Sequence, residues 1–211
     1  MSPRKTPSVQ VIVWIALYVL MVALSAWHPK DTLTWWLEIF PSAIGVAILA
    51  ATYRRFPLTP LLYWIILVHS AILYMGGHYT YAETPFPNLF GDLFGAGRNN
   101  FDKIGHFFQG VTPALLTREL LIRTSPLGPS KWLSFVSGSV ALAFSAFYEF
   151  IEWWTAVLGG ASSEAFLGTQ GYVWDTQSDM FMALIGATVA IAALWKLQDS
   201  QIAKIRATGR I

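Results

Sequence analysis

Three pairs of polar residues along this chain combine residue types and spacings that are suited to chemistry. The pairs are Asp102 with His106, Glu149 with Glu152, and Asp175 with Asp179. Their members stand three or four positions apart, so on a helix each pair projects from one face. A carboxylate near a lipid bilayer is costly unless it is paired, hydrated or coordinating a ligand, which makes such acids candidates for function.

Carboxylates and imidazoles are the side chains that hold divalent cations and move protons. A histidine with several carboxylates suits Zn, Mn or non-haem Fe, whereas oxygen ligands alone suit Mg or Ca. We assign metal-ligand roles to His106, Asp102, Asp175 and His78, and catalytic roles to Glu149, Glu152 and Asp179. Five acids close together need a counter-charge: Lys103, Arg98, a divalent metal ion, or protons retained on some of the acids.

The composition places these residues in a membrane protein. Of the 211 residues, 55% are hydrophobic and only 12% are charged, and the mean hydropathy is +0.48. These values leave too few charges to cover a soluble surface. A net charge of +2, from scattered basic residues, argues against nucleic acid as a partner. The chain has no cysteine, which excludes disulfides, thiolate metal sites and cysteine nucleophiles.

Apolar segments of membrane-spanning length predict an all-α, polytopic helix bundle in a single integral membrane domain, residues 1–211. The predicted spans are residues 9–27, 36–53, 58–75, 104–122, 132–158 and 180–197. The fourth is the weakest, because polar residues including Arg118 and Glu119 interrupt it. No internal repeat or soluble linker divides the chain.

The basic residues support six spans. With six crossings, three of the 14 basic residues, Lys30, Arg98 and Lys103, fall on one side, and the other eleven fall on the opposite side. By the positive-inside rule the eleven mark the cytoplasm, so both termini are cytoplasmic and the loops near residues 28–35, 76–101 and 159–179 face outward. This topology brings all three polar pairs to the outer end of the bundle. Gly105, Gly110 and Gly186 would let the helices approach closely there.

Several of these features also have a purely structural interpretation. Asp102 and Asp175 each begin a helix, where an acid can cap the N-terminus or interact with the helix dipole. His69, in the middle of the third span, is expected to make an interhelical hydrogen bond. The Gly76-Gly77 sequence is expected to end the third helix.

The chain resembles the YjdF-type family of bacterial inner membrane proteins over about residues 10–197. The resemblance is carried by four segments: 76–81 (GGHYTY), 102–107 (DKIGHF), 149–152 (EFIE) and 168–180, which begins with GTQG and ends with WDTQSDM. The chain is also similar, over a shorter motif, to VanZ-like membrane proteins. This similarity is carried by Asp102, Lys103, His106 and Phe107 and by the later acids on the helices. The resemblance implies a helical inner membrane protein and the location of a site, but no particular reaction.

Three classes of function fit these residues. The first is a metal-assisted hydrolase or transferase whose site opens to the outer face and whose substrate is an envelope lipid or lipid-linked phosphate. The second is a proton- or cation-coupled transporter, although a relay normally places polar groups at the bilayer midplane. The third is a scaffold or binding protein whose polar residues only hold helices together. Membrane lipids are the expected partners, and the sequence leaves the oligomeric state open.

The topology can be tested with alkaline phosphatase fusions. Fusions after Tyr53 and after Arg123 should be inactive, because these positions are assigned to the cytoplasm, whereas a fusion within residues 76–101 should be active. An active fusion at either of the first two positions would overturn the six-span arrangement.

Overall fold

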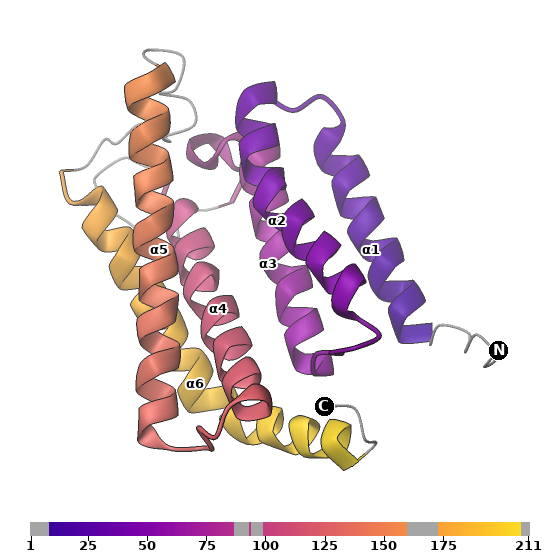
Figure 1. Ribbon diagram of the computed structural model, residues 1–211. Helices are drawn as coiled ribbons and strands as arrows, with labels where there is room; N and C mark the ends of the chain where they lie inside the picture. The colour runs from indigo at the N-terminus through magenta and orange to yellow at the C-terminus, as the bar shows by residue number, and fades with distance from the viewer. Residues whose placement is uncertain (1–8, 87–92, 94–98, 160–172, 208–211) are drawn as a thin grey trace.

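The computed structural model describes residues 9–86, 93, 99–159 and 173–207. The elements are α1 (Val9–Ala26), α2 (Thr32–Thr52), α3 (Pro60–Tyr79), the short 3-10 helix η1 (Tyr81–Glu83), α4 (Asp102–Thr124), α5 (Lys131–Gly159) and α6 (Asp175–Ala207). No strand occurs in these ranges, so the predicted all-α helix bundle is confirmed (Figure 1).

Five of the helices, all except α4, are long and apolar enough to cross a membrane. Helix α4 is the polar one, as the sequence indicates. It has 23 residues and runs alongside the others (Figure 1), with Lys103, Arg118, Glu119 and Arg123 all buried within the protein. Its charges therefore face protein, where they can be paired, and apolar side chains of the outer helices face the surroundings.

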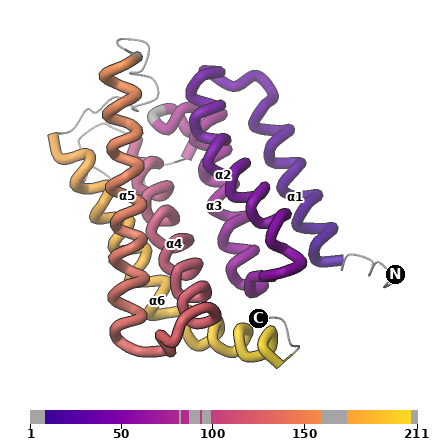
Figure 2. Tube along the Cα trace, in the orientation of Figure 1, coloured from indigo at the N-terminus to yellow at the C-terminus, as the bar shows by residue number. Residues whose placement is uncertain are grey.

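The helices form two groups of three. Helix α3 contacts α1 and α2, while α4, α5 and α6 contact one another (Figure 2). Contacts of α3 with α4, and to a smaller extent with α6, join the two groups. The first residues of α1 and the last of α6 lie at the same end of the bundle (Figure 1), as an even number of crossings requires. At that end, the last turns of α6 run across the bundle, where Arg206 donates to the carbonyl oxygen of Ile122.

Helices α2 to α6 are longer than the predicted apolar segments, whereas α1 ends one residue earlier than predicted. Helix α2 begins at Thr32 rather than near residue 36, because Asp31 caps it by accepting a hydrogen bond from the Thr34 backbone N–H at 2.6 Å. This bond lowers the pKa of Asp31 below its usual value. Helix α6 continues to Ala207 and has 33 residues. At about 1.5 Å per residue it is longer than a bilayer core of roughly 30 Å requires.

The expectation that Gly76 and Gly77 end the third helix is wrong. Helix α3 continues through both to Tyr79. A Cβ atom on Gly76 would overlap the ring of Tyr81, and one on Gly77 would lie 3.1 Å from the Glu38 Cβ. The two glycines therefore make room for side chains from η1 and α2, and both of those side chains belong to the candidate site.

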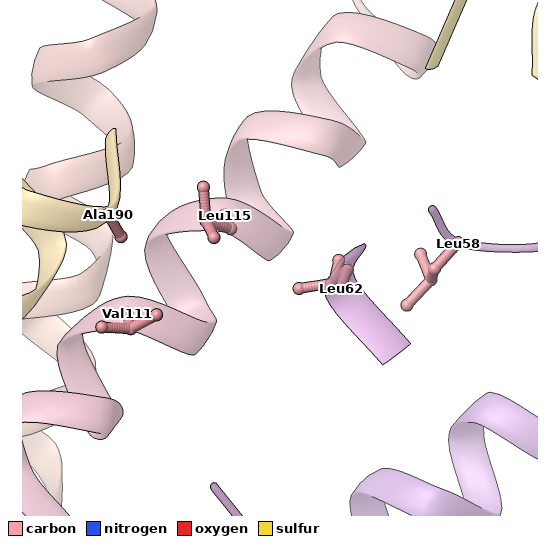
Figure 3. Packing of buried hydrophobic residues seen from close by; sticks show 5 residues of the cluster. All are labelled: Leu58, Leu62, Val111, Leu115 and Ala190. Atoms are coloured by element: carbon pink, nitrogen blue, oxygen red, sulfur yellow. The ribbon is translucent and has the colours of Figure 1, made fainter. Parts of the chain in front are cut away.

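The apolar core adjoins a group of polar contacts near the termini. Leu58, Leu62, Val111, Leu115 and Ala190 form a buried apolar cluster where α3, α4 and α6 meet (Figure 3). On the side of this cluster near the termini, Glu119 accepts hydrogen bonds from the Thr59 hydroxyl at 2.7 Å and from Arg123 at 2.9 Å. These partners satisfy a fully buried acid, which gives the polar end of α4 a structural explanation.

Helices α4 and α6 touch backbone to backbone at two glycines. A Cβ on Gly110 would overlap the carbonyl oxygen of Ala183, and one on Gly186 would overlap that of Phe107. The predicted close approach at these two positions is confirmed. At Gly105, a Cβ would make only ordinary contact with Tyr81.

Replacing Gly110 with alanine should destabilise the protein by about 1–3 kcal/mol or more, because the added methyl group must push α6 away. Gly138→Ala on α5 is the matched control, since nothing lies within 4 Å of a Cβ there. Thermal unfolding in detergent should show a lower midpoint for the first variant only. Equal midpoints would contradict close packing of α4 on α6.

Candidate functional site

A small polar cavity lies near the end of the bundle opposite the termini, where α4 and α6 begin. Its volume is about 40 Å³, roughly enough for a few waters or a cation with its remaining water ligands. Five helices, α2 to α6, and η1 supply its polar lining. These residues are Glu38, His69, Tyr81, Asp102, His106, Gln109, Tyr148, Glu152, Asp175 and Asp179.

Lys103 is the fixed cation of the site, and its side chain has no exposed surface. Its Nζ lies 2.7 Å from Asp175 Oδ1, 2.7 Å from Asp179 Oδ1 and 3.3 Å from Asp102 Oδ2. One ammonium therefore joins the first turn of α4 to the first two turns of α6. The counter-ion role expected for Lys103 has a direct geometric basis, whereas Arg98 lies outside the described residues.

A second group contains the histidine. Ligand atoms of His106, Glu149 and Asp179 all lie within 4.8 Å of one another, and the three residues are buried. His106 Nε2 is 3.5 Å from Asp179 Oδ1, and His106 Nδ1 is 3.8 Å from Glu149 Oε1. Glu149 is 6% exposed, and its Oε1 is buried with no hydrogen-bond partner. An unsatisfied buried carboxylate oxygen needs an explanation, and an ion is one of those available.

Gln109 orients the imidazole. His106 Nδ1 lies 2.9 Å from Gln109 Oε1. An amide oxygen only accepts hydrogen bonds, so with this orientation of the amide Nδ1 is the donor. Nε2 then turns a lone pair toward Asp179. Two acceptors facing each other at 3.5 Å call for a cation or a proton nearby. Hydrogen bonding that fixes the tautomer in this way is typical of metal-binding histidines.

Glu38 faces the same cavity from α2, and the sequence analysis did not find it. It is 2% exposed and accepts a hydrogen bond from the Tyr81 hydroxyl at 2.9 Å, with the Tyr148 hydroxyl 3.5 Å away. Burial, and then the neighbouring Glu38, raise the pKa of Tyr81 well above its ordinary value, so the phenol stays a donor at neutral pH. The sequence feature that could have indicated Glu38 is Gly76-Gly77. These glycines have no side chains and so leave space for Tyr81 and Glu38.

The structure thus brings together most of the residues selected from the sequence. Asp102, His106, Glu152, Asp175 and Asp179 line the cavity, and Glu149 lies beside His106. The acids nevertheless belong to two different groups. Asp102 and Asp175 contact Lys103, whereas Glu149 contacts His106.

The two other histidines of interest make structural contacts. His78 does not line the cavity, and its Nδ1 lies 3.0 Å from the carbonyl oxygen of Ser25, a contact that ties α3 to the end of α1. His69 makes an interhelical hydrogen bond with Thr112 at 3.1 Å, as expected, and also lines the cavity.

The fold and this site define a polytopic helical membrane protein with an acidic, histidine-containing cavity near one end of the bundle. Residues 10–200 match the family model described as "Predicted membrane protein (DUF2238)", and the chain belongs to this family. It is 49% identical over 172 residues to "Inner membrane protein YjdF" of Escherichia coli (strain K12), an alignment that covers 82% of each chain. No solved structure gives a significant match.

Lys103→Met should destabilise the protein by about 3–5 kcal/mol, because it leaves buried aspartates without their counter-ion. Lys131→Met, which removes an exposed lysine from the start of α5, is the matched control and should change the unfolding midpoint little. Adding Asp175→Asn to Lys103→Met should recover part of the loss, since one repelling charge is removed. If Lys103→Met unfolds at the same temperature as the control, the ammonium does not hold α4 to α6.

Proposed function

We propose that this protein is a metal-dependent hydrolase or transferase of the bacterial inner membrane, acting at the outer face on an envelope lipid or lipid-linked phosphate. The observation that carries the proposal is the group of His106, Glu149 and Asp179, whose ligand atoms lie within 4.8 Å of one another beside a polar cavity. One imidazole and two carboxylates with room for water are a donor set suited to Zn, Mn or non-haem Fe.

The electrostatics of the site favour a cation. Six carboxylic acids, Glu38, Asp102, Glu149, Glu152, Asp175 and Asp179, surround the cavity or its edge, and Lys103 is the cationic side chain that contacts three of them. A dication held by His106, Glu149 and Asp179 would relieve the remaining repulsion. A bound ion of this kind can polarise a phosphoryl or carbonyl oxygen or activate a water molecule.

The remaining residues divide the other tasks. Glu152 lines the cavity without belonging to the ligand group, so it is our candidate general base. Asp102 and Asp175, which the sequence analysis assigned as ligands, are instead proposed to hold Lys103. Glu38, Tyr81 and Tyr148 also line the cavity and are joined by hydrogen bonds, and they would orient bound water or substrate.

The proposed location rests on topology. The relative is named an inner membrane protein, and the distribution of basic residues assigns the end that holds both termini to the cytoplasm. The cavity lies toward the other end, so it would face the periplasm or exterior. An apolar layer around Leu62 and Leu115 separates it from the Glu119–Arg123 contact at the cytoplasmic end. This separation favours a site at one face over a continuous proton or cation relay.

The proposal is tested by metal analysis of protein purified in detergent. We expect close to one equivalent of Zn, Mn or Fe per chain, and a stabilisation by the added metal of roughly 2.7 kcal/mol at a hundred times the dissociation constant. His106→Ala should abolish both the bound metal and the stabilisation. His78→Ala is the matched control and should retain both, because His78 contacts the Ser25 carbonyl outside the cavity.

Two outcomes would contradict the proposal. The first is a wild-type protein that contains no metal and whose unfolding is unaffected by Zn, Mn, Fe or chelator. The second is metal binding that His106→Ala leaves unchanged, which would move the ion away from this group.

A further inference from the structure

An apolar groove runs along the outside of the seam between α5 and α6, with a volume of about 490 Å³. It is lined by Ser139, Leu142, Ala143 and Ala146 from α5 and by Met180, Phe181 and Leu184 from α6. On α5, the small residues Ser139, Ala143 and Ala146 fall at helical spacing on one face, so the groove follows from their missing side-chain volume.

The groove opens to the outside of the bundle. Phe181 is 56% exposed and Leu184 is 38% exposed, and both helices are apolar enough to span a membrane. Among the described residues that line the groove, Ser139 is the one with a polar side chain. Hydrocarbon is therefore the medium that would fill it.

The groove adjoins the polar site and lies on the bilayer-midplane side of it. Ala146 precedes Glu149 by three residues, about 4.5 Å along α5, and Met180 directly follows Asp179 on α6. From these positions the groove continues away from the cavity end, toward Ser139 and Leu184. In a lipid of the leaflet at the cavity end, the polar head group lies at the membrane surface and the acyl chains point toward the midplane. The polar cavity and the apolar groove follow each other in the same order.

We propose that this groove binds one acyl chain of a membrane phospholipid whose head group lies at the mouth of the acidic cavity. The inference rests on the proposed function and narrows its substrate class to a phospholipid of the outer leaflet. A cavity with room for only a few waters would admit the reacting part of the head group while the tail stays in the groove. Ala143 lies at the centre of the α5 wall, so its small side chain is the specificity-determining feature.

The test reconstitutes the full chain in phosphatidylethanolamine and phosphatidylglycerol vesicles containing a trace of a phospholipid with a diazirine in the middle of one acyl chain. After irradiation, mass spectrometry locates the adducts. We expect labelling at the residues that line the groove to be at least fivefold above labelling at Phe144 and Val189, which are exposed on the same helices but do not line the groove.

Ala143→Leu fills the groove and should reduce this labelling at least fivefold, while Ala193→Leu, the same change at an exposed alanine of α6, should leave it unchanged. Ser139→Leu provides a second filling variant if Ala143→Leu fails to fold. Uniform labelling around both helices, or labelling that persists in a folded filling variant, would overturn the proposal and indicate ordinary surrounding lipid.

Metal content measured on the same samples separates this proposal from the previous one. A groove without selective labelling in a protein that retains its metal would refute the acyl-chain site alone. Selective labelling in a protein without metal would support the groove and refute the metal-dependent reaction.

Discussion

A buried ammonium among aspartates holds together α4 and α6, the two helices that begin at the candidate site. Lys103 Nζ contacts Asp175 and Asp179 of α6 at 2.7 Å and lies 3.3 Å from Asp102 of its own helix. A buried charge that loses its partner costs several kcal/mol, so these groups are constrained to stay together. The glycine contacts between α4 and α6 allow the two backbones to approach closely enough for this arrangement.

The same constraint organises the rest of the site. Fixing the first turns of α4 and α6 orients His106, one turn after Lys103, toward Asp179 at 3.5 Å. Helix α5 then brings Glu149 Oε1 to 3.8 Å from His106 Nδ1. Asp179 is the shared element, because its Oδ1 contacts the ammonium and also lies close to Nε2. Asp179 therefore has the fixed ammonium on one side and the imidazole of His106 on the other.

The sequence was sufficient to predict features that depend on the spacing of residues along one helix and on the alternating directions of successive helices. Polar pairs at three or four residues share a helix face, and alternating helix directions bring the pairs at 102, 149 and 175 to one level, as the structure has them. Glu38 was missed because its contact with the site depends on how α2 packs against α3. Gly76-Gly77 was misread for the same reason, since the ring that occupies the space beside Gly76 belongs to the following η1 turn. His78 shares the level of the site, but its ring contacts the end of α1.

The central claim is that His106 is the single nitrogen ligand of a cation also held by Glu149 and Asp179. Pulsed electron paramagnetic resonance on the purified protein loaded with one equivalent of Mn²⁺ tests it directly, because the spectrum reports nitrogen nuclei coupled to the ion. The account predicts coupling to one imidazole nitrogen that disappears in His106→Ala and persists in His78→Ala. A spectrum with no nitrogen coupling, or coupling that survives in His106→Ala, would contradict it.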